Sequence, residues 1–123
     1  MKYMLLIYGN EAALQGRPKA QADEMLAAYG AYTEALQKSG ALASANRLQR
    51  SVAATTVRVV DGKTKVLDGP YAETKEQLLG FYVVDCKNLD EALDVARELG
   101  AANPGGAYEI RPVGVLNPGS VAT

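Results

Sequence analysis

The sequence predicts an α+β domain in which two helices pack on one face of an antiparallel sheet. Two observations carry this prediction. Apolar residues recur at helical spacing in two long stretches, and the segments around them have the alternating or β-branched patterns typical of strands. With 123 residues, the chain is long enough to bury its own core, so we expect one domain over residues 1–123.

The first predicted strand spans residues 3–8 and is followed at once by Gly9 and Asn10. Because both its odd and its even positions are apolar, we expect both of its faces to be buried and its place in the sheet to be central. The run is too short for a signal peptide or a membrane span, and no other segment approaches membrane-spanning length. We therefore expect a soluble protein without a membrane partner, and the single cysteine of the chain fits a reducing cytoplasm.

The first helix is predicted from Pro18 to Lys38, where apolar residues recur at spacings of three and four. Proline suits the first turn of a helix, and Gly40 supplies the left-handed residue that commonly closes one. Residues 41–50 have a weaker pattern, which we interpret as a strand.

A β-hairpin is predicted around Asp61-Gly62, because this dipeptide suits the positive backbone angles of a two-residue turn and β-branched residues flank it. A turn at Asp68-Gly69-Pro70 ends the hairpin. The apolar residues 78–85 then form the next strand.

The second helix is predicted to begin behind Asn88 and Glu91, which have the spacing of a capping box, and to end at Gly100. Residues 107–113 alternate as a last strand, and Pro112 indicates that this strand finishes near a sheet edge.

The resulting order of elements matches a split βαβ, ferredoxin-like architecture. Two helices can cover only one face of its sheet. Because the first strand is apolar on both faces, the other face needs a second layer, and a twofold dimer that buries sheet against sheet is the simplest way to supply it. We therefore expect a homodimer.

The composition excludes several classes of function. Thirteen Lys and Arg against fourteen Asp and Glu leave a net charge of −1, so we expect no nucleic-acid binding. Without histidine, the chain lacks Ser-His-Asp and Cys-His sets and a credible zinc or iron site, and we expect no metal or nucleotide cofactor. The single cysteine, Cys86, is predicted to be buried as a small hydrophobe in a reducing compartment.

The segment "DGPYAETKEQLLGFYVVD", together with "MKYMLLIYGNEAAL" at the start and "NPGGAYEIRPV" near the end, resembles the YCII-related family in its Asp-Gly-Pro-Phe branch. The resemblance covers nearly the whole chain and implies ferredoxin-like subunits that form a dimeric α/β barrel. The chain departs from the branch signature at Tyr71, where phenylalanine is usual. It also has no histidine, so the His-Asp pair of the founding branch cannot operate here.

Asp68 is the candidate catalytic residue, because it corresponds to the signature aspartate of the family it resembles. It would act as a general base or as a carboxylate that orients a ligand. The alternative is a structural turn residue whose side chain accepts hydrogen bonds from the backbone amides ahead of it.

The candidate ligand-binding residues surround this turn. Lys75 would neutralise an anionic ligand, and Arg111 would either hold a ligand carboxylate or pair with a carboxylate such as Asp68 or Glu73. The alternative is that this loop is polar only because it lies in solvent, and that its side chains bind no ligand. The full set of candidates is Tyr71, Glu73, Thr74, Lys75 and Arg111.

Two hypotheses for function follow. The first is a protein that binds a small organic ligand beside the DGPY segment. The ligand is neutral in one version and anionic in the other, and the protein either only binds it or also carries out cofactor-free lyase or isomerase chemistry. Relatives of this fold act on ring-derived hydroxylated or lactone compounds, and this substrate class is what the resemblance implies. The second is a non-enzymatic partner in an extracytoplasmic-function sigma factor system, because this branch resembles proteins encoded beside such factors.

Overall fold

The computed structural model describes residues 1–114; the end of the predicted domain, residues 115–123, lies outside the described part. The elements in chain order are β1 (Lys2–Gly9), α1 (Glu11–Gln15), α2 (Lys19–Ser39), β2 (Leu42–Arg47), the 3-10 turn η1 (Ser51–Ala53), β3 (Thr55–Val60), β4 (Lys63–Asp68), β5 (Gln77–Asp85), α3 (Leu89–Ala102) and β6 (Ala107–Pro112). This mixture confirms the predicted α+β class.

The main sheet has four strands in the order β2-β5-β1-β6, and all neighbouring strands are antiparallel. The central place of β1 and the edge place of β6 agree with the sequence prediction. Pro112 is tolerated because it ends an edge strand, where a missing N–H interrupts no central ladder.

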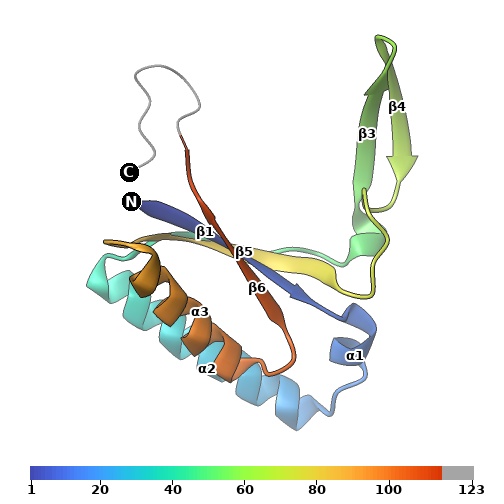
Figure 1. Ribbon diagram of the computed structural model, residues 1–123. Helices are drawn as coiled ribbons and strands as arrows, with labels where there is room; N and C mark the ends of the chain where they lie inside the picture. Colours follow the sequence, from blue (N-terminus) through green and yellow to red (C-terminus); the bar gives the residue numbers. More distant parts are fainter. Residues whose placement is uncertain (115–123) are drawn as a thin grey trace.

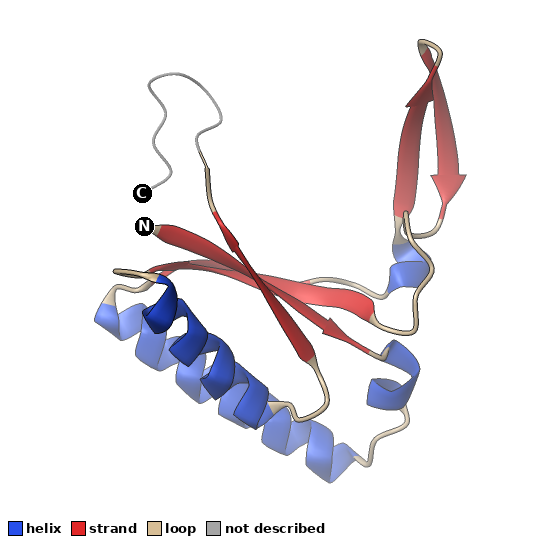
Figure 2. Ribbon diagram, viewed as in Figure 1, coloured by secondary structure: helices blue, strands red, loops and turns tan. Residues whose placement is uncertain are grey.

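Both long helices lie on one face of this sheet, as predicted (Figures 1 and 2). Alternate residues of β1 point toward the helices and are buried, whereas the residues between them are half-buried on the other face. The largest fully buried side chains of the core are Leu5, Val84 and Leu99, which come from β1, β5 and α3. The helix-facing side therefore carries the hydrophobic core.

The opposite face, which we call the open face, is apolar at its centre. Met4 and Leu6 of β1 lie on it beside Val83 and Phe81 of β5. No helix of residues 1–114 covers this face (Figure 2). A second layer from another subunit stays a prediction.

One end of each long helix follows the predicted local chemistry. Asn88 Oδ1 accepts a hydrogen bond from the backbone N–H of Glu91 at 3.1 Å, and Gly40 closes α2 with a φ of 80°. The Glu91 carboxylate accepts from the backbone N–H of Lys87 instead of closing the usual capping box on Asn88. The predicted end of α3 at Gly100 is wrong, because the helix continues to Ala102 and its end is satisfied by Asn103.

The predicted β3–β4 hairpin is present, but it forms a separate two-stranded sheet. Asp61 and Gly62 have φ angles of 51° and 75°, as the two-residue turn requires. A backbone hydrogen bond of 2.7 Å from Gly69 N to Ala54 O closes the base of the hairpin. From this base the hairpin projects away from the main sheet, on the side opposite to the helices (Figure 1).

Candidate functional site

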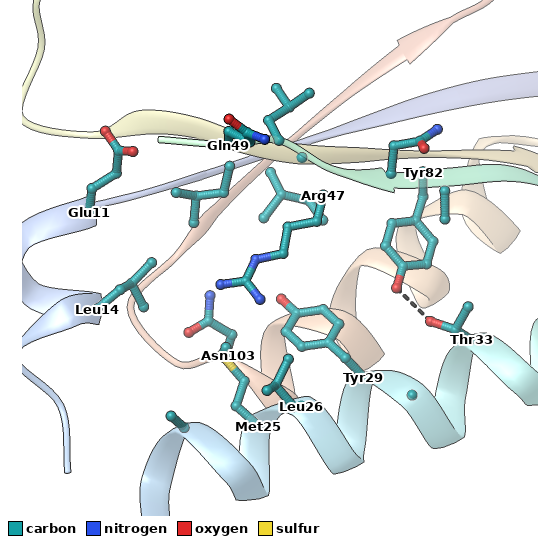
Figure 3. A pocket seen from close by; sticks show the side chains of 18 of the residues that line it. Glu11, Leu14, Met25, Leu26, Tyr29, Thr33, Arg47, Gln49, Tyr82 and Asn103 are labelled. Carbon is teal, nitrogen blue, oxygen red and sulfur yellow. Dashed lines mark hydrogen bonds between the residues drawn. The ribbon is translucent and has the colours of Figure 1, made fainter. Parts of the chain in front are cut away.

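A cavity of about 670 Å³ lies between α2 and the helix-facing side of the sheet, near the ends of β2 and α1 (Figure 3). Its walls are mainly apolar, and they come from β1, α1, α2 and β5. The apolar lining includes Ile7, Leu14, Met25, Leu26 and Leu79. A space of this size and character is typical of sites for small organic molecules.

Arg47 is one of three arginines that line this cavity, the others being Arg17 and Arg50. It is the last residue of β2 and lies opposite Gly80, so its side chain falls on the helix-facing side of the sheet. Figure 3 shows its guanidinium directed into the space beside Tyr29 and Asn103. Within residues 1–114 Arg47 makes no ion pair with Asp or Glu, so its charge is available to a ligand.

Gly80 makes the approach of β2 to β5 possible at this point. A Cβ atom on Gly80 would lie 2.6 Å from the carbonyl oxygen of Asn46 and 3.3 Å from the Cα of Arg47. Both neighbours are backbone atoms, which cannot move without shifting β2. The absence of a side chain at Gly80 therefore helps to set the position of Arg47 at the cavity.

Tyr29 lines the cavity, and hydrogen bonds connect its hydroxyl to Tyr108 and then to Leu99, which are not lining residues. Tyr108 Oη donates to the carbonyl oxygen of Leu99 at 3.2 Å, and the hydroxyl groups of Tyr29 and Tyr108 are hydrogen-bonded to each other. Since the single Tyr108 proton goes to Leu99, Tyr29 must donate to Tyr108. Burial, with the Tyr108 hydrogen bond, raises the pKa of Tyr29 far above its usual range, so Tyr29 stays neutral.

A second polar pair crosses the same wall further along α2. Thr33 Oγ1 and Tyr82 Oη are 2.5 Å apart and join α2 to β5 (Figure 3). The cavity thus combines an apolar space with the hydroxyl groups of Tyr29, Thr33 and Tyr82, three guanidinium groups, and the carboxylates of Glu11 and Glu34. Its arginines suit a ligand with one anionic end and an apolar body.

The end of the cavity near α1 is tied together by Glu11. Its carboxylate accepts hydrogen bonds from the backbone N–H of Ser51, at 2.9 Å, and from Ser51 Oγ. Its own backbone N–H donates to Gln77 Oε1 at 2.9 Å. The hydrogen bond from the Ser51 side chain lowers the pKa of Glu11, so this carboxylate is ionised at neutral pH.

A smaller cavity of about 360 Å³ adjoins this end and shares Glu11 and Arg50 with the larger one. Thr74 and Lys75, two of the residues predicted from the sequence, line it. The Thr74 hydroxyl donates to the Glu76 carbonyl, and the Thr74 carbonyl accepts from Gln77 Nε2 at 2.6 Å. The loop between β4 and β5, which we call the DGPY loop, therefore lines the smaller cavity through Thr74 and Lys75.

The other predicted residues of this loop lie apart from the cavity. Asp68 is exposed at the end of β4, opposite Thr55, and its side chain makes no hydrogen bond within residues 1–114. Asp68 therefore does not accept the expected hydrogen bonds from the turn amides. The backbone N–H of Gly69 donates to the carbonyl oxygen of Ala54 instead. Tyr71 is 75% exposed, with the Arg58 guanidinium 5.2 Å from its ring centre, while Glu73 is exposed.

Arg111 lies far from the loop. It pairs with Glu109 at 3.2 Å, rather than with Asp68 or Glu73. Arg111 of β6 pairs with Met4 of β1, whereas the DGPY loop ends at Gln77 of β5, which pairs with Gly9 of β1. Five residues of β1 separate these positions, which is roughly 17 Å along a strand. The structure does not bring Arg111 together with the DGPY loop.

Sequence reasoning missed the residues that shape the cavity. Tyr29 and Thr33 were part of a helical stripe that predicts core packing, and Arg47 lies in the weakest strand pattern of the chain. One signal was present, because a spacing of four residues places the Tyr29 and Thr33 hydroxyls on the same side of α2. Nothing in the sequence placed Arg47 opposite them.

The remaining sequence predictions concern metals, membranes and Cys86. Residues 1–114 contain no group of three or more His, Cys, Asp or Glu side chains placed to hold a metal ion. In the same part of the chain, each helix is either too short or too polar to cross a membrane. Cys86 is buried, as predicted, and burial raises the pKa of its thiol.

Comparison with known proteins agrees with the family resemblance. A family model described as the YCII-related domain matches residues 1–117. An uncharacterized protein of Rhizobium meliloti (strain 1021) is 43% identical over 122 residues, which cover 98% of this chain and 98% of that protein. Membership of the Asp-Gly-Pro-Phe branch stays a prediction. With a family model over almost its full length and a relative of this similarity, the chain belongs to the YCII-related family.

Proposed function

We propose that this protein binds a small organic anion with an apolar body in the cavity between α2 and the sheet. The observation that carries the proposal is the Arg47 guanidinium, which is directed into the cavity and has no carboxylate partner in residues 1–114 (Figure 3). A guanidinium presents paired N–H donors that match the two oxygens of a carboxylate. An anionic group beside Arg47 would leave the rest of the ligand against Leu14, Leu26 and Leu79.

The polar groups of the cavity favour binding over turnover. Glu11 is a weak base, because its hydrogen bonds with Ser51 lower its pKa. Tyr29 is a weak acid, because burial raises its pKa. General acid–base catalysis works best when the pKa of the group lies near the working pH, and both groups are shifted away from it. We therefore place ligand binding first and cofactor-free lyase or isomerase chemistry second.

In the catalytic version of the proposal, Asp68 is the base and the loop residues Tyr71, Glu73, Thr74 and Lys75 complete the site. Thr74 and Lys75 line the adjoining cavity, which supports their part in it. Asp68 and Tyr71 are exposed and lie on the hairpin side, so they would reach a ligand only from outside this cavity. Arg111 would act at a separate place, because it pairs with Glu109 near the other end of β1.

The binding proposal is tested with benzoate and its neutral analogue benzamide, followed by ¹H-¹⁵N NMR titration of the full chain. Benzoate is expected to shift resonances of residues around Tyr29 and Arg47, and benzamide to bind at least tenfold more weakly. In Arg47→Gln the benzoate affinity should fall about tenfold or more, since a hydrogen bond to a charged group contributes roughly 1.5–3 kcal/mol.

Arg58→Gln is the matched control, because Arg58 is also an exposed strand arginine but lies on the hairpin. Its benzoate affinity should equal that of the wild type. Equal weakening in both variants would mean a general charge effect. Shifts confined to residues near Arg111 or Asp68 would place the ligand elsewhere and contradict the proposal.

A second candidate function, regulation through a protein partner such as a sigma factor system, is favoured by the acidic surface of α3. Asp90 and Glu98 are exposed on this helix and make no ion pair within residues 1–114. Complementation of a gene deletion separates the candidates. Failure of Asp90→Lys/Glu98→Lys with full activity of Arg47→Gln and Asp68→Asn supports the partner. The reverse result supports the small molecule.

A further inference from the structure

Asn103 is a buried polar residue in the wall of the large cavity. Tyrosine and cysteine aside, it is the only polar residue of residues 1–114 that is buried, with 5% of its surface exposed. It follows the last turn of α3, where its backbone N–H donates to the carbonyl oxygens of Leu99 and Gly100, each at 3.2 Å. These bonds hold the backbone, whereas the side-chain amide lines the cavity. Because a buried amide costs free energy unless it is hydrogen-bonded, the partners of this side chain decide what it can do.

The hydrogen bonds around Tyr29 determine how this amide is oriented. The Tyr29 hydroxyl donates to Tyr108, which donates to the Leu99 carbonyl, so the Tyr29 oxygen can only accept further hydrogen bonds. An amide beside it must therefore present its NH₂ group and not its carbonyl oxygen. Burial raises the pKa of Tyr29, and the Asn103 side chain acts in the opposite direction, as an N–H group directed at the phenolic oxygen does.

The carbonyl oxygen of the amide, Oδ1, is left for the cavity. A Cβ atom on Gly106 would lie 3.2 Å from Asn103 Nδ2, so the missing side chain of Gly106 makes room for the NH₂ group. Within residues 1–114 no side-chain nitrogen or oxygen is enclosed without a hydrogen-bond partner. Because no donor of these residues reaches Oδ1, this oxygen is open to the cavity that Asn103 lines.

The Asn103 amide lies next to the Arg47 guanidinium (Figure 3). The two groups have opposite chemistry, because the guanidinium only donates hydrogen bonds and Oδ1 only accepts them. The carbonyl groups at the C-terminus of α3 carry partial negative charge, which also favours a donor over a second anion at this place. The wall therefore provides a site for an anion and, beside it, a site for a group that donates a hydrogen bond.

We propose that the ligand of this cavity is a 2-hydroxy acid, whose carboxylate binds Arg47 while the hydroxyl on the neighbouring carbon donates to Asn103 Oδ1. This inference rests on the proposed binding of an organic anion, and it names the chemical class of that anion. A hydroxyl fits better than an ammonium group, because the three arginines of the cavity outnumber its two carboxylates and disfavour further positive charge.

This arrangement selects a ligand by its donor group. A site built to hydrogen-bond a hydroxyl rejects an analogue that lacks it, because the buried acceptor is left unpaired. A methyl ether at the same carbon keeps the oxygen and loses the proton. The cavity of about 670 Å³ has room for the added methyl group. Weak binding of the ether would therefore report a missing hydrogen bond and not steric exclusion.

The test compares three probes by ¹H-¹⁵N NMR titration of the full chain: phenylacetate, mandelate and 2-methoxy-2-phenylacetate. Phenylacetate has only the anion and the apolar ring, mandelate adds the hydroxyl, and the third probe replaces this hydroxyl with the ether. The enantiomers are titrated separately, and the tighter one of each pair is compared. We expect mandelate to bind about five- to tenfold more tightly than phenylacetate, as one net hydrogen bond predicts, and the ether to bind no more tightly than phenylacetate.

Two variants test the role of the amide. Asn103→Leu removes Oδ1 at nearly constant volume and should abolish the preference for mandelate. Asn46→Leu is the matched control, because Asn46 is an exposed asparagine that pairs with Phe81, on the open face of the sheet, and its preference should equal that of the wild type. The ¹H-¹⁵N spectra also show whether each variant is folded. The wild-type comparison of probes needs no variant, so it tests the inference even if Asn103→Leu is unfolded.

Tyr108→Phe tests the order of donors. It frees the Tyr29 proton, so the wall gains a donor that an ether oxygen can accept from. The affinity of the ether relative to mandelate should then rise at least about threefold. An unchanged ratio would mean that the ether is excluded by its size, which would overturn the selection by hydrogen bonding.

The remaining outcomes separate this inference from the proposed function. Equal affinities of the wild type for mandelate and phenylacetate, both weakened by Arg47→Gln, would overturn the 2-hydroxy acid and leave the anion site standing. Equal loss of the preference in Asn103→Leu and Asn46→Leu would overturn the role of Asn103. If none of the three probes shifts resonances around Arg47, the proposed function fails and the inference fails with it.

Discussion

The phenolic oxygens of Tyr29 and Tyr108 are hydrogen-bonded to each other, although the two residues are 79 positions apart in the chain. This bond joins α2 to β6, and Tyr29 of the pair lines the cavity. Because the Tyr108 hydroxyl donates its hydrogen bond to the Leu99 carbonyl, the Tyr29 hydroxyl must donate to Tyr108. The lone pairs of the Tyr29 oxygen are then left to accept from groups in the cavity. The same contact thus stabilises the fold and shapes the site.

Tyr108→Phe is expected to lower the free energy of unfolding by about 1–3 kcal/mol, because it removes the acceptor of the half-buried Tyr29 hydroxyl. It also removes one of the two hydrogen bonds to the Leu99 carbonyl, which keeps the backbone N–H of Asn103. Urea denaturation measures the change. Tyr32→Phe is the control. Tyr32 is a half-buried tyrosine of the same helix without a hydrogen bond in residues 1–114, and its change should stay below about 0.5 kcal/mol. Equal losses in both variants would contradict the role of the bond.

The stability of the protein is expected to fall at alkaline pH, and Tyr29 should contribute to the fall. Burial raises the pKa of Tyr29 in the folded state, so above the ordinary tyrosine pKa of about 10 the unfolded chain loses its proton first. Stability is therefore full below that pH and declines above it. Urea denaturation at several pH values should show the gap between wild type and Tyr29→Phe narrowing above about pH 10. A constant gap would refute this account.

Glu11→Gln is expected to destabilise the protein at neutral pH by about 1 kcal/mol, because a neutral amide is a weaker acceptor for Ser51 than a carboxylate. The pKa of Glu11 is lowered in the folded state. The stabilisation is therefore present above the ordinary glutamate pKa of about 4.3 and is lost as the pH falls through the lowered value.

The measurement is again urea denaturation, at neutral and at acidic pH. The gap between wild type and Glu11→Gln should close as the medium becomes acidic. Glu24→Gln serves as the control, because Glu24 is exposed on α2 and makes no ion pair within residues 1–114. A gap that is the same at both pH values would argue against an ionised Glu11 as the acceptor.

Gly80→Ala and Gly30→Ala are expected to change stability in opposite directions. A Cβ at Gly80 would collide with the backbone of β2, which should cost about 1–3 kcal/mol and weaken benzoate binding by moving Arg47. Gly30 lies within α2 with open space around its missing Cβ, so alanine should add about 0.5–1 kcal/mol there. Thermal and urea denaturation of both variants check the signs.

The elements that could be predicted are those whose causes are local. Asn88 caps α3 and Gly40 ends α2 through contacts within a few residues. The Asp61-Gly62 turn needs only the backbone freedom of its own two residues. The central place of β1 followed from its apolar residues on both faces, because such a pattern records two buried sides.

The short helix α1 and the turn η1 were not predicted, and their positions explain why. Glu11 holds them together through Ser51, a contact across 40 residues of sequence that no local pattern records. The cavity was missed for the same reason. Arg47 and Tyr29 come from different elements, and only the pairing of β2 with β5 directs the Arg47 side chain toward α2.

By itself, the sequence determined the α+β class, the family, the order of the strands and the two long helices, the start of α3 and the end of α2, because periodicity, capping and turn chemistry act over a few residues at a time. Only the tertiary structure decided that the hairpin stands apart and that Arg47 lies beside Tyr29. It also decided that Arg111 and the DGPY loop are at opposite ends of β1. These outcomes depend on strand register and on the packing of segments that are distant in sequence. Such contacts are determined by how the whole sheet pairs, and not by the few residues on either side of each one.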